Sequence, residues 1–199
     1  MATKQDYNKD AVTVASVGRI YVATEADGAA FAGVEDLTAE DSKWTSLGLF
    51  DAETGVEHAF EEETQDIKSW QQGTVRTIVT SRDLTLKFSA LETSPRTLEL
   101  FYGLAPGSIQ DGASFEWRIG AAAKRERFAA VMVLEDGDTV ITCHLKSAQV
   151  SEVEAPKFTA SNAVMWGMTV KALGSEYETG KGSDLAAWKF EKGGTSGNA

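Results

Sequence analysis

Residues 83–103, DLTLKFSALETSPRTLELFYG, join a strand-like segment to a helix-like one. Apolar and polar residues alternate through Leu84–Phe88, which is the period-two pattern of a β-strand with one buried face. Ser94 then offers a helix N-cap, Pro95 a first helical position and Gly103 a C-terminal stop. A helix this short is not stable alone. We therefore expect it to pack against a sheet.

Strand-like patterns recur on both sides of this stretch. The turn at 135–138, with its Asp-Gly pair, predicts a hairpin. Residues 128–134 and 163–172 are apolar on both faces, as in a central or interface strand. Further strands are expected at 18–24, 75–80, 114–119, 141–146 and 186–191. The predicted fold is mostly β: an antiparallel β-sandwich or barrel with one short α-helix packed on one side, and with extended loops and termini.

The chain has 199 residues, which suits one domain. We expect a flexible N-terminal arm at 1–13, a single β-sandwich domain at 14–191 with long loops near 25–43 and 51–66, and a flexible Gly/Ser-type C-terminal tail at 192–199.

Targeting and redox signals are few. The first ten residues are polar and do not resemble a signal peptide. The longest apolar run, 128–134, is far shorter than the roughly 20 residues of a membrane helix. The single cysteine, Cys143, alternates with Ile141 and Leu145 and is interpreted as a buried small hydrophobe. These features predict a soluble protein with no membrane partner, made in a reducing cytoplasm.

The net charge of −11 is concentrated in one segment. Residues 25–66 contain thirteen acids and one base, Lys43, so they carry −12 and the rest of the chain +1. This indicates a local acidic surface or a solvated acidic loop. Nonspecific binding to nucleic acid, which needs clustered Lys and Arg, is not expected.

No arrangement typical of an enzyme is found. His144 falls on the polar side of its strand and is predicted at the surface, and His58 has no second histidine near it for a metal. Glu61, Glu62 and Glu63 are consecutive, so in a strand they point to opposite faces and cannot flank one sugar. The prediction is a non-enzymatic protein with no cofactor and no metal site.

The segment Trp44–Gly103 resembles the major tail tube proteins of siphophages. The resemblance rests on the order of Trp44-Thr-Ser-Leu-Gly48, the turn at 51–55, the acidic stretch, Ile67-Lys-Ser-Trp-Gln71 and the helix at 95–103. It implies a β-sandwich subunit whose sheets join in hexameric rings, which stack into a hollow tube. The implied location is the virion tail. The implied partners are the chain itself, a tape-measure protein, a tail terminator and baseplate or distal tail proteins, while genomic DNA passes through the lumen without sequence-specific binding.

In such a tube the acidic segment is expected to contribute to the contact between rings and to the lumen. We expect part of 51–66 to form an inter-ring loop, with some carboxylates entering the lumen, where they repel the DNA backbone. The acids concerned are Asp51, Glu53, Glu57, Glu61, Glu62, Glu63 and Asp66, and their possible ion-pair partners are Lys68, Arg76 and Arg82.

Other virion roles stay open on the sequence. The five tryptophans could form a stacking platform in a carbohydrate-binding or receptor-binding module, and a tail terminator or decoration subunit is a nearer alternative. Trp117 and Trp188 fall on apolar faces and are predicted in the core, whereas Trp44 and Trp70 border loops.

Overall fold

The computed structural model describes residues 12–121, 124–174 and 184–192. The expected arm at 1–13 and tail at 192–199 fall almost wholly outside these ranges. The elements in chain order are β1 (Val17–Thr24), the 3₁₀ helix η2 (Val34–Thr38), β2 (Thr45–Ser46), β3 (Val56–Ser69), β4 (Gly73–Ala90), α1 (Pro95–Tyr102), β5 (Phe128–Asp136), β6 (Thr139–Val153), β7 (Trp166–Ala172) and β8 (Ala187–Lys192).

In the described residues the strands form one antiparallel sheet in the order β2-β1-β5-β6-β7-β4-β3, with β8 added beside β6. The long strand β6 is where the sheet divides. Its residues 139–144 pair with β8, and its residues 148–153 pair with β7. The Asp-Gly turn predicted between β5 and β6 is present, with Gly137 at a φ of 57°. The prediction of a mostly antiparallel β fold with one helix is confirmed.

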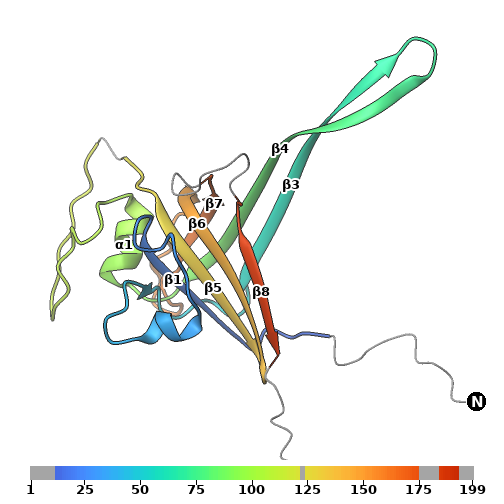
Figure 1. Cartoon of the computed structure of the whole chain (residues 1–199). Helices are drawn as coiled ribbons and strands as arrows, with labels where there is room; N and C mark the ends of the chain where they lie inside the picture. Colours follow the sequence, from blue (N-terminus) through green and yellow to red (C-terminus); the bar gives the residue numbers. More distant parts are fainter. Residues whose placement is uncertain (1–11, 122–123, 175–183, 193–199) are drawn as a thin grey trace, which may run out of the picture.

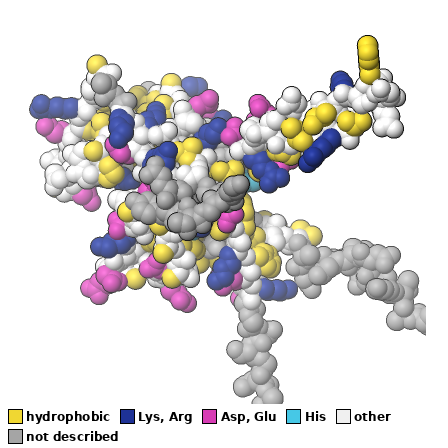
Figure 2. All heavy atoms as spheres, turned by 45° about the horizontal axis from the view of Figure 1, so that its top comes forward, with side chains coloured by type: hydrophobic (Ala, Val, Ile, Leu, Met, Phe, Trp, Pro, Cys, Tyr) yellow, Lys and Arg dark blue, Asp and Glu magenta, His cyan; other side chains and the backbone are white. Residues whose placement is uncertain are grey.

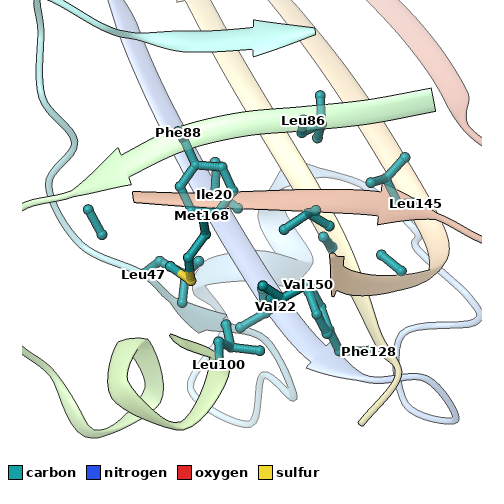
Figure 3. Close-up of a cluster of buried hydrophobic side chains, with 14 of the residues drawn as sticks. Ile20, Val22, Leu47, Leu86, Phe88, Leu100, Phe128, Leu145, Val150 and Met168 are labelled. Carbon is teal, nitrogen blue, oxygen red and sulfur yellow. The ribbon is translucent and has the colours of Figure 1, made fainter. Parts of the chain in front are cut away.

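The main core lies between parts of the sheet that are not neighbours within it. Leu86 and Phe88 of β4 and Met168 of β7 pack in one cluster with Ile20 and Val22 of β1. Figure 3 shows these side chains between the strands. The sheet therefore curls over its own apolar face, which gives the sandwich-like arrangement predicted from the alternating patterns.

Helix α1 closes one side of this core, as its sequence predicts. The backbone N–H of Thr97 donates to Oγ of the N-cap Ser94 at 3.2 Å. Gly103 ends the helix in the left-handed region, at a φ of 68°. Leu98 and Phe101 are buried in the main core. The sequence therefore predicts both the capping residues of α1 and the face of α1 that packs on the core.

The opposite face of β1 and β5 is covered by the segment 25–44, which contains η2. Val131 and Val133 of β5 pack there against Leu37 and Trp44. This second cluster explains why β5 is apolar on both faces. His144 lies beside it and is buried, 5% exposed, with Nε2 2.8 Å from the carbonyl oxygen of Gly28. The predicted surface position of His144 is wrong, because the 25–44 segment covers that end of β6.

Two stretches differ from their predicted structure. Residues 56–66, predicted as part of a long loop, belong to strand β3, and only the turn at 51–55 precedes it. Both faces of β3 are largely exposed, so no period-two pattern marks it as a strand. Residues 114–119, predicted as a strand, pair with no strand in the described structure. Trp117 instead stacks on Tyr102 of α1, with ring centroids 6.4 Å apart.

Candidate assembly surface

Strands β3 and β4 form a hairpin that leaves the body of the protein. Figure 1 shows the distal part of this hairpin extending away from the other elements. β3 and β4 pair from Val56↔Phe88 at the base to Ser69↔Gly73 at the tip, with register shifts after Glu63 and Ile67. Only the lower part of β4, Thr85–Ala90, also pairs with β7. In the described residues β3 pairs with β4 alone, so its outer row of backbone N–H and C=O groups is open.

One face of this part of the sheet carries an excess of carboxylates. Side chains directly opposite one another in a ladder lie on the same face. Glu57 is opposite Lys87, Glu61 is opposite Asp83, and Glu63 is opposite Ser81, whose Oγ donates to Glu63 at 3.2 Å. We call this the acidic face, and its six carboxylates belong to Glu57, Glu61, Glu63, Asp83, Glu152 and Glu154.

Two lysines partly neutralise the acidic face. Lys87 Nζ lies 2.7 Å from Glu154 Oε1, and Lys171 Nζ lies 2.8 Å from Asp83 Oδ1. The hydrogen bond to Glu154, and then the charge of that carboxylate, raise the pKa of Lys87. Lys171 relieves the repulsion between Asp83 and the facing Glu61. Six carboxylates against two ammonium groups leave this face with a net charge of −4.

The acids that the sequence predicts for the inter-ring loop or the lumen do not all lie on the acidic face. Glu62 is on the other face, where Arg82 Nε holds its Oε1 at 2.7 Å. Asp66 lies beyond the first register shift and accepts a hydrogen bond from Thr77 Oγ1 at 2.7 Å. Of the three predicted bases, only Arg82 forms an ion pair within the described chain. Lys68 and Arg76 lie in the distal part of the hairpin.

Asp51 and Glu53 belong to the turn before β3 rather than to the hairpin. Asp51 Oδ2 accepts hydrogen bonds from the backbone N–H and from Oγ1 of Thr54, both at 2.9 Å. The backbone hydrogen bond, followed by the side-chain one, lowers the pKa of Asp51. Asp51 is therefore an ionised turn residue with its own structural role.

Three acids of the acidic face lie outside the predicted set: Asp83, Glu152 and Glu154. They come from β4, β6 and the residue after β6, so only the pairing of strands distant in sequence places them beside Glu57. No local signal identifies them. The alternation around Asp83 does predict its strand, but not its neighbours.

The tip of the hairpin is apolar and exposed. Trp70 is fully exposed, at 102% of its reference area, and Ile67 and Val75 are about half exposed. Figure 2 shows hydrophobic side chains along this arm and at its far end.

Trp44, in contrast to Trp70, is buried in the second cluster. Trp117 and Trp188, predicted in the core, are 37% and 48% exposed, so that prediction is wrong.

The described residues hold no metal site, and Cys143 is not an activated thiol. No group of three His, Cys, Asp or Glu side chains among them could hold a metal ion. Burial raises the pKa of the Cys143 thiol to about 12, so the thiolate nucleophile is suppressed. The part of the chain that the structure describes also contains no helix long and apolar enough to cross a membrane.

The projecting hairpin and the open edge of β3 leave backbone groups available for pairing with another chain. A family model described as phage tail tube protein matches residues 5–193. The chain belongs to this family, and it is a structural protein of the virion tail.

Two curated relatives agree with this assignment. The chain is 30% identical over 158 residues to the Major tail protein Gp23 of Mycobacterium phage L5, and 31% identical over 159 residues to that of Mycobacterium phage D29. Each match covers 74% of this chain and 77% of the relative. Because these relatives are structural proteins, the prediction of a non-enzymatic role is confirmed.

A solved structure supports the fold. The tube-terminating cap of the anti-feeding prophage superposes with a TM-score of 0.50 at 11% identity, over 96% of this chain and 99% of that chain. The predicted resemblance to tail tube proteins, drawn from residues 44–103, therefore extends over most of the chain.

Proposed function

We propose that six copies of this protein close side by side into a ring, and that the rings stack into the hollow tube through which the phage genome leaves. The hairpin β3–β4 carries this proposal. Within the described residues, its distal part packs on no other element and its outer edge is open. Open edges of this kind invite pairing with another chain. A closed ring removes such edges from every subunit at once.

The acidic face suits the lumen of the tube. Duplex DNA carries one negative charge per about 1.7 Å of its axis. Carboxylates repel this backbone within a Debye length of about 8 Å at physiological salt. With a net −4 on the acidic face of each subunit, a ring of several copies gives DNA a repelling wall to slide along. Glu57, Glu61 and Glu63 would then face the lumen, together with Asp83, Glu152 and Glu154.

The hairpin beyond the acidic face is assigned to the contact between rings. It includes residues 64–66, the end of the segment 51–66 in which an inter-ring contact is expected from the sequence. The other components of the tail fit the two ends and the interior of such a tube: a tape-measure protein inside it, a terminator at one end, and baseplate or distal tail proteins at the other.

The first test is direct. The purified protein at high concentration should form rings or tubes with six-fold symmetry in negative-stain or cryo-electron microscopy. A protein that stays monomeric at every concentration and in every salt condition contradicts the proposal.

The second test separates the lumen from the rest of the surface. Glu61→Lys with Glu63→Lys reverses two charges on the acidic face. Glu40→Lys with Asp41→Lys makes the same change in charge on exposed residues of the 25–44 segment. We expect phage carrying the first pair to assemble tails but to eject DNA several-fold more slowly, and phage carrying the second pair to eject normally. Equal ejection by both would remove the lumen assignment.

A further inference from the structure

A groove opens at one end of the core, close to the base of the hairpin. Its volume is about 620 Å³, which lies in the range of pockets that take a small ligand or a large side chain. It is lined by the start of β1, by the 46–56 segment and by Leu134 of β5. Leu49 and Val17 present exposed apolar surface there, 67% and 41% exposed. The groove therefore offers hydrophobic walls that nothing in the described chain covers.

The charge at the groove is negative. Asp51 and Glu92 line it, and neither forms an ion pair among the described residues. Glu53 lies in the same turn, between lining residues Ala52 and Gly55. The one arginine of the lining, Arg19, is neutralised by Glu135, with NH1 2.6 Å from Oε1. Both carboxylates accept hydrogen bonds, Asp51 from Thr54 and Glu92 from the backbone N–H of Leu49 at 2.9 Å, but no cation of the described chain neutralises either of them.

The tip of the hairpin is positively charged, in contrast to the groove. Residues 67–76 contain two bases, Lys68 and Arg76, and no acid, in a chain whose net charge is −11. Neither base forms an ion pair within the described residues. Between them stands Trp70, fully exposed. An exposed tryptophan flanked by cations is the kind of anchor that dominates binding energy at protein interfaces.

The tip cannot reach the groove of its own chain. Val56 lines the groove and begins β3, whereas Trp70 follows the last residue of that 14-residue strand. At a rise of about 3.3 Å per residue, the tip stands about 45 Å from the groove. Figure 1 shows the hairpin extended away from the body. Any contact between tip and groove therefore joins two copies.

We infer that the Trp70 tip of one copy docks into the Leu49 groove of a second copy. Trp70 packs against Leu49 and Val17, and Lys68 and Arg76 face Asp51, Glu53 and Glu92. This inference rests on the proposed tube and names the receiving site on the neighbouring ring. Each copy has one tip and one groove at opposite ends of its hairpin, so the contact propagates from copy to copy.

Cysteine cross-linking tests the pairing. The variant carrying Leu49→Cys and Gln71→Cys is assembled, oxidised and run on a non-reducing gel. We expect a ladder of multimers, because each copy links to the next. The native Cys143 is buried and does not compete. The matched control, Ser114→Cys with Gln71→Cys, places the first thiol on an exposed residue of a different segment and should give no ladder. Tubes that form without the ladder would overturn this inference while leaving the proposed tube intact.

Two further variants test the inference if the double-cysteine protein does not assemble. Trp70→Ala should abolish tube formation without changing thermal stability, because the side chain is fully exposed in the single chain. Lys68→Glu with Arg76→Glu should slow elongation about tenfold, and adding Glu53→Lys should restore part of the rate. A Trp70→Ala protein that elongates like the wild type would also overturn the inference. Wild-type protein that forms no tube at all counts against the proposed function instead.

Discussion

Nε2 of His144 lies 2.8 Å from the backbone carbonyl oxygen of Gly28, which is 116 residues away in sequence. This hydrogen bond attaches the 25–44 segment to the middle of β6. The rings of Phe31 and Trp44 pack on the same imidazole, with centroids 5.4 and 5.9 Å from it. Burial is the main effect that lowers the pKa of His144; the hydrogen bond to Gly28 opposes it, and the charge of Lys146 adds to it. The imidazole is therefore neutral in the folded protein near pH 7.

The neutral state of His144 predicts a loss of stability in mild acid. Its pKa is lower in the folded than in the unfolded chain, so the unfolded state binds more protons as pH falls below about 6.5. We expect the free energy of unfolding to decrease from pH 7 to pH 5, with a slope of at most about 1.4 kcal/mol per pH unit from this group. Denaturant titrations at several pH values measure it.

A variant that lacks the imidazole is the control for this prediction. His144→Gln should flatten the pH dependence, because the amide does not titrate in this range. An unchanged slope in His144→Gln contradicts the assignment.

Cys143 should be inert in the native protein. Its side chain is fully buried, and its thiol pKa is raised to about 12. At pH 8 a thiol-specific chromogenic reagent should label fewer than one in ten molecules of native protein within an hour, and all of them after unfolding in guanidinium. Fast labelling of the native wild type would show that β6 opens readily. Gln71→Cys serves as the positive control, since its thiol lies on the exposed tip.

The ion pair of Arg96 and Glu99 should matter far more than the other short-range pairs. Glu99 is 2% exposed, its Oε2 lies 3.3 Å from Arg96 NH1, and its Oε1 accepts the N–H of Ile109 at 3.0 Å. Arg96→Ala leaves that carboxylate buried without its cation, at a cost of about 2–4 kcal/mol in unfolding free energy. Arg118→Ala removes an exposed pair with Glu116 and should cost less than about 1 kcal/mol. Similar losses for both variants would contradict this ranking.

The length of the hairpin sets a limit on the spacing of rings. If the tip of one copy seats in the groove of the next, the two grooves are separated by the distance from groove to tip, about 45 Å. The axial repeat of the tube, read from layer lines in electron micrographs, should not exceed this value. A longer repeat is incompatible with tip-to-groove docking, whatever the symmetry of the ring.

The sequence predicts those elements whose boundaries are marked by their own residues. α1 has a cap residue, a first-turn proline, a terminal glycine and one apolar face, and the structure places each as expected. β5 has no polar face, yet its length and the Asp-Gly turn after it are enough to mark it as a strand. In these cases local chemistry and tertiary burial agree.

Prediction from the sequence fails where the environment of a residue depends on distant segments. β3 is exposed on both faces and so lacks the alternation of a half-buried strand. His144 has polar neighbours in sequence, but its burial comes from residues 25–44. Trp188 of β8 lies opposite Cys143 and packs edge-on against His58 of β3, with ring centroids 5.2 Å apart, yet it remains 48% exposed. The carboxylates of the acidic face come from three strand segments, β3, β4 and the end of β6, and the sequence singles out only those of β3.

The open edge of β3 has a consequence for how copies of this protein first meet. Its exposed stretch includes Glu57, Glu61, Glu62 and Glu63. Were two copies to pair through this edge about a two-fold axis, carboxylates would stand opposite carboxylates, which destabilises a ladder. The edge is therefore favourable only against a different strand of the partner. In the proposed ring, such a heterologous joint would not end in a closed pair of molecules, so the like charges on β3 would disfavour a two-fold dimer and favour a rotational arrangement of several copies.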